Sequence, residues 1–122
     1  MPSVLIVDDE PNIAVSLDFL MRQQGYAVRT VHSGEAALAA LAAEPADVVL
    51  LDVMLPDRDG LDVCQTIRAN TAWKQTRVLM VSAKGRPVDE ARARARGADG
   101  YVVKPFAIQD VVARVRGLVE AR

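Results

Sequence analysis

Polar side chains that could do chemistry together stand directly after four short apolar stretches of the chain. They are Asp8 and Asp9, Asp52, Ser82 and Lys104. Apolar stretches of this length are typical of strands that are buried on both faces of a parallel sheet. The carboxyl ends of parallel strands meet at one edge, which is where open α/β sheets bind ligands. We therefore expect these side chains to converge on one site.

Three carboxylates at one place repel one another, so the predicted site requires a cation. Mg²⁺ prefers carboxylate oxygens, keeps several waters and commonly acts beside phosphate groups. Opposite such an ion, Lys104 as a point charge and Ser82 as a short-range donor form a pocket for an anion. The pattern indicates metal-assisted transfer of a phosphoryl group, in which a carboxylate could be the acceptor. Asp52, which directly follows four consecutive aliphatic residues, is the first candidate.

The elements that must position these residues alternate between strand and helix five times. Strands are expected at 4–7, 26–31, 47–51, 77–81 and 101–103. Helices are expected at about 11–25, 35–43, 61–67, 88–96 and 108–119. This alternation predicts a parallel sheet that right-handed crossovers cover on both faces. The fourth helix offers mainly Val88, Ala91 and Ala95 as an apolar face, so we expect it to be the least firmly packed.

Composition limits the class of protein. The chain has 122 residues, enough for one domain, and its net charge of −1 gives no electrostatic argument for binding nucleic acid or an anionic membrane. The single cysteine, Cys64, excludes an internal disulfide and fits a reducing compartment. No apolar run approaches the roughly 20 residues that span a bilayer. We expect a cytoplasmic protein.

Four segments of the sequence, at 7–11, 51–60, 81–85 and 97–106, resemble the receiver domain of two-component response regulators. Together, in this order and at these spacings, they are highly specific, and the resemblance covers essentially the whole chain. It implies one receiver domain over 1–122 with a flavodoxin-like (βα)5 fold. In that fold a five-stranded parallel sheet of order 2-1-3-4-5 carries helices on both faces.

The resemblance also implies how phosphorylation would occur. Asp52 would accept a phosphoryl group from the phosphohistidine of a sensor histidine kinase or of a histidine phosphotransfer protein. Asp9 would bind Mg²⁺ (or Mn²⁺) directly, together with the Asp52 carboxylate and the backbone carbonyl of Met54. Asp8 would hold the ion largely through water.

Further residues would bind the phosphoryl group and respond to it, again by resemblance. Lys104, aimed by a cis peptide bond before Pro105, would pair with the phosphoryl oxygens. Ser82 would donate a hydrogen bond to one of them, and its inward movement would let Tyr101 rotate from an exposed to a buried position. Simple packing is the alternative for Tyr101.

Two more positions, Met54 and Lys84, face the path of the phosphoryl group in this family and tune its hydrolysis. The alternative for both residues is simple exposure. Cys64 lies on the apolar pattern of its helix and is expected to be buried packing.

The predicted function is a phosphorylation-dependent signalling switch rather than a metabolic enzyme, although it would assist its own phosphotransfer and dephosphorylation. A phosphatase acting on external substrates would typically have a second aspartate at the position of Met54. A flavin-binding domain of this fold would need a hydroxyl- and glycine-rich loop where residues 8–11 stand.

The output of the switch stays open. The surface of the fourth helix, fifth strand and fifth helix would control an output partner or domain, and the sequence does not decide whether the domain stands alone. A phosphorylation-dependent homodimer through that surface is a further possibility by resemblance, since Leu55-Pro56 with Asp59-Gly60, and Arg114 on the last helix, are similar to receivers that pair in this way. Against it, Gly100 stands where such dimers often have an acidic residue after Asp99.

Overall fold

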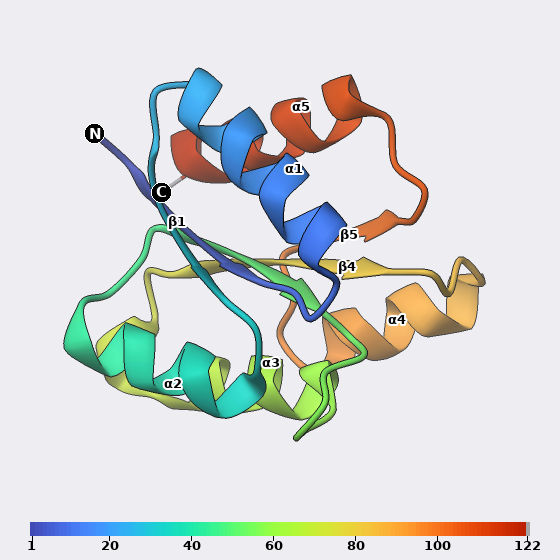
Figure 1. Cartoon of the computed structure of the whole chain (residues 1–122). Helices are drawn as coiled ribbons and strands as arrows, with labels where there is room; N and C mark the ends of the chain where they lie inside the picture. The colour runs from blue at the N-terminus through green and yellow to red at the C-terminus, as the bar shows by residue number, and fades with distance from the viewer. Residues whose placement is uncertain (122) are drawn as a thin grey trace.

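Five parallel strands form one sheet in the computed structural model, which describes residues 1–121 (Figure 1). The strands are β1 (Ser3–Val7), β2 (Ala27–Val31), β3 (Val48–Asp52), β4 (Arg77–Ser82) and β5 (Gly100–Val103). Their order is β2-β1-β3-β4-β5, so the predicted flavodoxin-like fold is confirmed. The order reverses between β1 and β3, and in open α/β sheets such a reversal marks the ligand crevice.

Helices cover both faces of the sheet, as the alternation of elements predicted. They are α1 (Pro11–Gln23), α2 (Gly34–Ala43), α3 (Gly60–Ala69), α4 (Pro87–Ala95) and α5 (Ile108–Glu120), with a short 3₁₀ helix η1 (Thr71–Trp73). The pair α1 and α5 lies on one face, and α2, α3 and α4 lie on the other (Figure 1). Within residues 1–121 no helix combines the length and the hydropathy that a membrane crossing requires.

The core lies in two apolar clusters, one on each side of the sheet. Successive side chains of β3 point into opposite clusters. Leu51 packs toward α2 and α3, whereas Leu50 packs toward α1 and α5. Every residue of β3 is buried. Burying a leucine side chain fully contributes roughly 2 kcal/mol, so the strand that carries Asp52 is firmly held. The continuous apolar run in the sequence is explained by this burial on both faces.

Two helices end at glycines in the left-handed region of the backbone. Gly25 after α1 has a φ of 89°, and Gly97 after α4 has a φ of 102°. Both follow the last helical turn, where glycine adopts this conformation without the steric cost of a Cβ. The predicted ends of these two helices are therefore correct to within about two residues.

The predicted apolar face of α4 is wrong. Val88 is 49% exposed, Ala91 and Ala95 are exposed as well, and the buried residues of the helix are Asp89 and Ala93. The Asp89 carboxylate turns back to the backbone N–H of Arg86 (3.2 Å) and forms a capping box with it. Ala93 is the only apolar side chain that α4 buries in the described chain, which fits the expected light packing.

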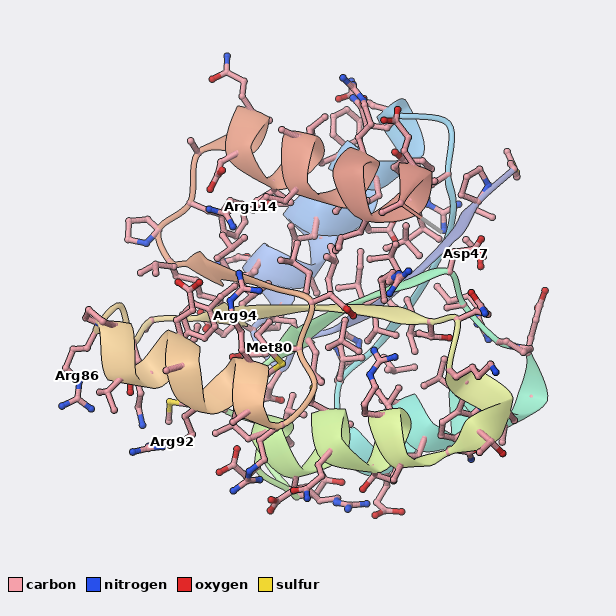
Figure 2. All side chains as sticks on the ribbon, turned by 180° about the vertical axis from the view of Figure 1, so that it is seen from behind. Asp47, Met80, Arg86, Arg92, Arg94 and Arg114 are labelled. Atoms are coloured by element: carbon pink, nitrogen blue, oxygen red, sulfur yellow. The ribbon has the colours of Figure 1, made fainter. Side chains whose placement is uncertain are left out.

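The outer side of α4 carries arginines. Arg92 projects away from the helix, and Arg94 lies over β5, as does Arg114 from α5 (Figure 2). Arg86, directly before the helix, pairs with Asp89 in its first turn (3.1 Å). Arg94 pairs with Glu90 (3.0 Å) and Arg114 pairs with Asp110 (3.0 Å), each within its own helix. Exposed pairs of this spacing stabilise a helix by roughly 0.3–0.5 kcal/mol.

Candidate functional site

The structure brings four of the predicted site residues together at the carboxyl edge of the sheet. Asp8 directly follows β1, Asp52 and Ser82 are the last residues of β3 and β4, and Lys104 directly follows β5. β1 and β3 are neighbours, so the two aspartates lie on either side of the point where the strand order reverses. The edge is therefore assembled by the sheet itself rather than by flexible loops.

Lys104 is the centre of the site. Its Nζ lies 3.2 Å from Asp52 Oδ2, 3.3 Å from Asp8 Oδ2 and 3.0 Å from Glu10 Oε1. The Lys104 side chain is 12% exposed, and those of Asp8 and Asp52 are 2% and 5% exposed. Charges that are buried this deeply persist only when they are paired, and one lysine serves two buried aspartates here.

Burial and pairing have opposite effects on the charges of this site. Burial raises the pKa of the Asp8 carboxyl, and the hydrogen bond from the Glu10 amide and the charge of Lys104 offset only part of the rise. For Lys104, burial alone would lower the pKa, but the hydrogen bond to Glu10 and the charges of Asp52 and Asp8 outweigh it and raise the pKa. Lys104 thus stays a cation, while Asp8 would ionise more readily beside a further positive charge.

The donor atoms of the site suit a hard divalent cation. Asp8, Glu10 and Asp52 each offer a carboxylate oxygen, and these oxygens lie within 4.8 Å of one another. Carboxylate oxygen is the ligand that Mg²⁺ and Mn²⁺ prefer, so the residues fit such an ion. Glu10 was not among the residues predicted from the sequence, although it continues the acidic run after β1.

The predicted direct metal ligand Asp9 is exposed and is not part of that group of oxygens among the described residues. Its role therefore stays a prediction. The backbone of Met54 does lie at the site, because its N–H donates a hydrogen bond to Asp52 Oδ1 (3.1 Å). Coordination by the Met54 carbonyl likewise stays a prediction.

The loop between β3 and α3 is closed tightly behind Asp52. The N–H of Gly60 donates to the carbonyl of Val53 (2.7 Å), and Met54 pairs with Asp59 in an antiparallel bridge. A Cβ at Gly60 would collide with the backbone carbonyl of Asp52. The loop thus needs glycine at this position so that the first turn of α3 can approach the end of β3.

Ser82 and Tyr101 both contact the backbone of Lys84. Ser82 Oγ accepts from the Lys84 N–H (3.1 Å), and the Tyr101 hydroxyl donates to the Lys84 carbonyl (2.6 Å). Tyr101 is 4% exposed, so the exposed starting position that we expected is not found. The rotation of Tyr101 stays a prediction. The same β4–α4 loop links both residues, which gives a physical route between them.

The remaining predicted positions lie at the mouth of the site. Met54 is 69% exposed, and Lys84 is exposed too. Exposure fits both simple solvation and a role in tuning hydrolysis, so that role stays a prediction. The peptide bond between Lys104 and Pro105 is cis, the isomer that the resemblance implied. Cys64 is fully buried in the apolar cluster that faces α2, α3 and α4.

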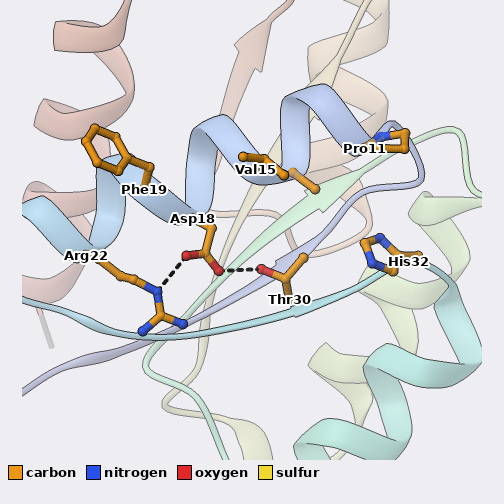
Figure 3. Close-up of a pocket in the computed structure, with 8 residues that line it drawn as sticks. Pro11, Val15, Asp18, Phe19, Arg22, Thr30 and His32 are labelled. Carbon is orange, nitrogen blue, oxygen red and sulfur yellow. Dashed lines mark hydrogen bonds and ion pairs between the residues drawn. The ribbon is translucent and has the colours of Figure 1, made fainter.

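A groove of about 480 Å³ lies elsewhere, between α1 and β2 (Figure 3). Its walls include Val15 and Phe19, and its polar contact joins Asp18 to Arg22 (2.6 Å) and to Thr30 (3.0 Å). This groove has neither a lysine nor a second carboxylate in its lining. The groove therefore lacks the combination of lysine and paired carboxylates on which the predicted phosphoryl chemistry depends, and the Lys104 site has it.

Comparison with known proteins agrees with this geometry. The family model of the response regulator receiver domain matches residues 4–116. The chain is 42% identical to the sensory transduction protein RegX3 of Mycobacterium tuberculosis and 41% identical to that of Mycolicibacterium smegmatis. Each match covers 119 residues, 98% of this chain and 51% of the relative. The chain thus spans about half the length of these curated relatives.

Solved structures show the same fold. A putative response regulator from Chloroflexus aurantiacus is 34% identical, with a TM-score of 0.92 over the whole of both chains. A beryllofluoride-activated receiver domain named DrrB is 33% identical, with a TM-score of 0.89 over 98% of each chain. The family match, the fold and the acidic edge with its lysine agree, and the chain belongs to the response regulator receiver domains of two-component systems.

Proposed function

We propose that the chain is a phosphorylation-dependent switch in which Asp52 accepts a phosphoryl group. The donor would be the phosphohistidine of a sensor histidine kinase or of a histidine phosphotransfer protein. One observation carries the proposal: the buried Asp52 carboxylate lies 3.2 Å from Lys104 Nζ at the end of β3, beside a second buried aspartate, Asp8. A nucleophilic carboxylate with a fixed cation beside it suits the capture of an anionic phosphoryl group.

In the proposed transfer, a carboxylate oxygen of Asp52 attacks the phosphorus atom. The bond between phosphorus and the donor's imidazole nitrogen breaks, and its electron pair leaves with the imidazole. Lys104 exchanges its contacts with carboxylates for the new phosphoryl oxygens, and Ser82 donates a hydrogen bond to one of them. Asp8, Asp9, Asp52 and the Met54 carbonyl would hold Mg²⁺ or Mn²⁺, which would offset the negative charge that gathers there.

The proposed response begins at Ser82 and Tyr101. When Ser82 turns toward the phosphoryl group, its Oγ leaves the Lys84 N–H, and the loop that Tyr101 also contacts is released. The adjoining α4 buries one apolar side chain, so a bias of a few kcal/mol suffices to shift its position. The surface of α4, β5 and α5 would carry this change to an output domain or effector.

Location, output and assembly remain proposals as well. We place the domain, over 1–122, in the cytoplasm, where a sensor kinase would present its phosphohistidine, and we assign it no direct contact with nucleic acid. A phosphorylation-dependent homodimer through α4, β5 and α5 would show as a rise in mass by light scattering when beryllofluoride and Mg²⁺ are added. An unchanged mass would count against it.

Labelling by a small phosphodonor such as acetyl phosphate tests the proposed acceptor. We expect wild-type protein with Mg²⁺ to gain the mass of one phosphoryl group and Asp52→Asn to gain none, because the amide is not a nucleophile. Asp62→Asn, at an exposed position of α3, is the matched control and should label normally. Undiminished labelling of Asp52→Asn would overturn the assignment.

A further inference from the structure

The side chain of Asp57 ties the loop after Asp52 to a helix that is distant in the sequence. Its Oδ1 accepts from the backbone N–H of Gly34 (2.8 Å), and its Oδ2 accepts from that of Glu35 (2.9 Å). These are the first two residues of α2, whose amide groups have no acceptor inside the helix. The β3–α3 loop thus reaches the start of α2 (Figure 1).

The charge of Asp57 suits this position. Hydrogen bonds from the amides of Glu35 and Gly34 hold the pKa of the Asp57 carboxyl below its ordinary value. A carboxylate at a helix N-terminus is also stabilised by the helix dipole, and hydrogen bonds to an ionised acceptor are stronger than neutral ones. Asp57 therefore contacts α2 as an anion throughout the physiological pH range.

A second contact joins the same two segments. Arg58 pairs with Glu35 (3.0 Å), and its carbon chain packs against Gly34, where an added Cβ would lie 3.2 Å from Arg58 Cβ. Ser33 caps α2 separately, because its own hydroxyl accepts from the N–H of Ala36 (3.1 Å). The loop contacts and the local cap of α2 are thus carried by different side chains.

The other end of the loop lies at the phosphoacceptor. The Met54 N–H donates to Asp52 Oδ1 (3.1 Å), and Met54 bridges to Asp59 across the loop. Between these points Leu55 packs against the apolar core, whereas Pro56 and Asp57, which follow it, are exposed. The exposed part of the loop is instead tied to α2 by the polar contacts of Asp57 and Arg58.

From these contacts we infer that Asp57 is a positioning residue of the phosphoacceptor site, which holds the β3–α3 loop and the backbone of Met54 in place against α2. The inference rests on the proposed function, in which Met54 supplies a metal ligand. Within the described part of the chain, Asp57 makes no hydrogen bond or ion pair with Asp52 or Lys104, so it acts through the loop and not on the phosphoryl group. Without it, the loop tip moves and the oxygen ligands of the cation are less well ordered.

The experiment compares Asp57→Ala with Ser33→Ala. Both variants remove a cap of α2, but only the first releases the loop. We expect Asp57→Ala to weaken Mg²⁺ binding and to slow labelling by acetyl phosphate by about threefold or more. That is below the roughly 10–100-fold loss that follows removal of a direct partner of a metal ligand. Asp57→Asn, which keeps one acceptor for the amides, should lie between Asp57→Ala and wild type, and Ser33→Ala should match wild type in both assays.

Backbone hydrogen exchange gives a readout that does not depend on phosphorylation. The amides of residues 53–55 should exchange faster in Asp57→Ala than in wild type and should be unchanged in Ser33→Ala. If Asp57→Ala binds Mg²⁺ and exchanges like wild type, or if Ser33→Ala shows the same losses, the inference is wrong. A wild-type protein that takes no label would refute the proposed function alone, because the exchange comparison would still decide the role of Asp57. Asp57→Asn answers the question if the alanine variant does not fold.

Discussion

Lys104 Nζ lies 3.2 Å from Asp52 Oδ2, although the strands that carry the two residues, β5 and β3, are separated in the sheet by β4. The same Nζ reaches Asp8 Oδ2 at 3.3 Å. Lys104 therefore neutralises the same two carboxylates, Asp8 and Asp52, that a divalent cation would bind. This competition between a lysine and a metal ion has measurable consequences.

Replacing Lys104 by glutamine should strengthen Mg²⁺ binding, because Asp8 and Asp52 lose the cation that now neutralises them. We expect a gain in affinity of about tenfold, which corresponds to about 1.4 kcal/mol. Mg²⁺ should then raise the thermal midpoint of the variant more than that of wild type. Labelling by acetyl phosphate should slow, because the phosphoryl oxygens lose a partner. Lys74→Gln, at an exposed position, is the control, and weaker stabilisation of Lys104→Gln by Mg²⁺ would contradict this account.

Gly60→Ala should destabilise the fold by about 2 kcal/mol or more, since the new Cβ collides with the backbone carbonyl of Asp52 and the strand end must move. Labelling of Asp52 should fall along with stability. Gly117→Ala provides the opposite case: Gly117 lies inside α5, and a Cβ there would meet no atom within 4 Å. It should stabilise the protein by about 0.5–1 kcal/mol. Urea denaturation measures the free energy of unfolding of both variants. If Gly60→Ala and Gly117→Ala change it equally, the steric argument is refuted.

Asp99 should matter more for stability than an exposed aspartate. Its Oδ2 accepts from the N–H of Val78 (2.8 Å) and lies 3.1 Å from Arg68, while its Oδ1 lies 3.6 Å from Arg77. Asp99→Ala leaves these partly buried donors without their acceptor, and we expect a loss of about 2 kcal/mol. Asp62→Ala breaks only an exposed pair and should cost less than about 1 kcal/mol. Similar denaturation midpoints for the two variants would show that the Asp99 contacts add little.

Cys64 should behave as an inert core residue. Burial raises the pKa of its thiol from 9.0 to about 11. At a given pH below 9, a shift of this size lowers the thiolate fraction about a hundredfold, and only the thiolate reacts. Iodoacetamide at pH 8 should therefore modify the denatured protein at least about a hundred times faster than the native protein. Comparable rates would show that the thiol is accessible.

The same thiol predicts a loss of stability in alkali. The folded state keeps the Cys64 proton up to a pH of about 11, whereas the unfolded chain releases it near 9.0. The folded state thus binds more protons in this window, so stability falls as the pH rises from 9 to 11. Cys64→Ala should reduce the fall in the free energy of unfolding between pH 9 and pH 11. If the fall is unchanged in this variant, other groups cause the loss of stability in alkali.

The sequence by itself determined the sheet and the edge at which the chemistry would occur. β1, β3 and β4 are buried on both faces, and such burial leaves an uninterrupted apolar run in the sequence. Strands that run parallel must end at the same edge, so the polar residues after them could be placed together before any contact was known. Asp8, Asp52 and Lys104 meet for this reason.

Only the tertiary structure decided which further side chains join them. Glu10 contacts Lys104 from 94 positions away, and Asp57 reaches the amides of α2 from another loop. Asp89 is buried on α4, although the apolar pattern had predicted that Val88, Ala91 and Ala95 would be the buried residues of this helix. A polar contact of this kind depends on the relative placement of two elements and leaves no periodic trace in either one. Hydrophobic periodicity therefore predicts the scaffold, whereas the hydrogen bonds that hold the site's loops in place come from the folded structure alone.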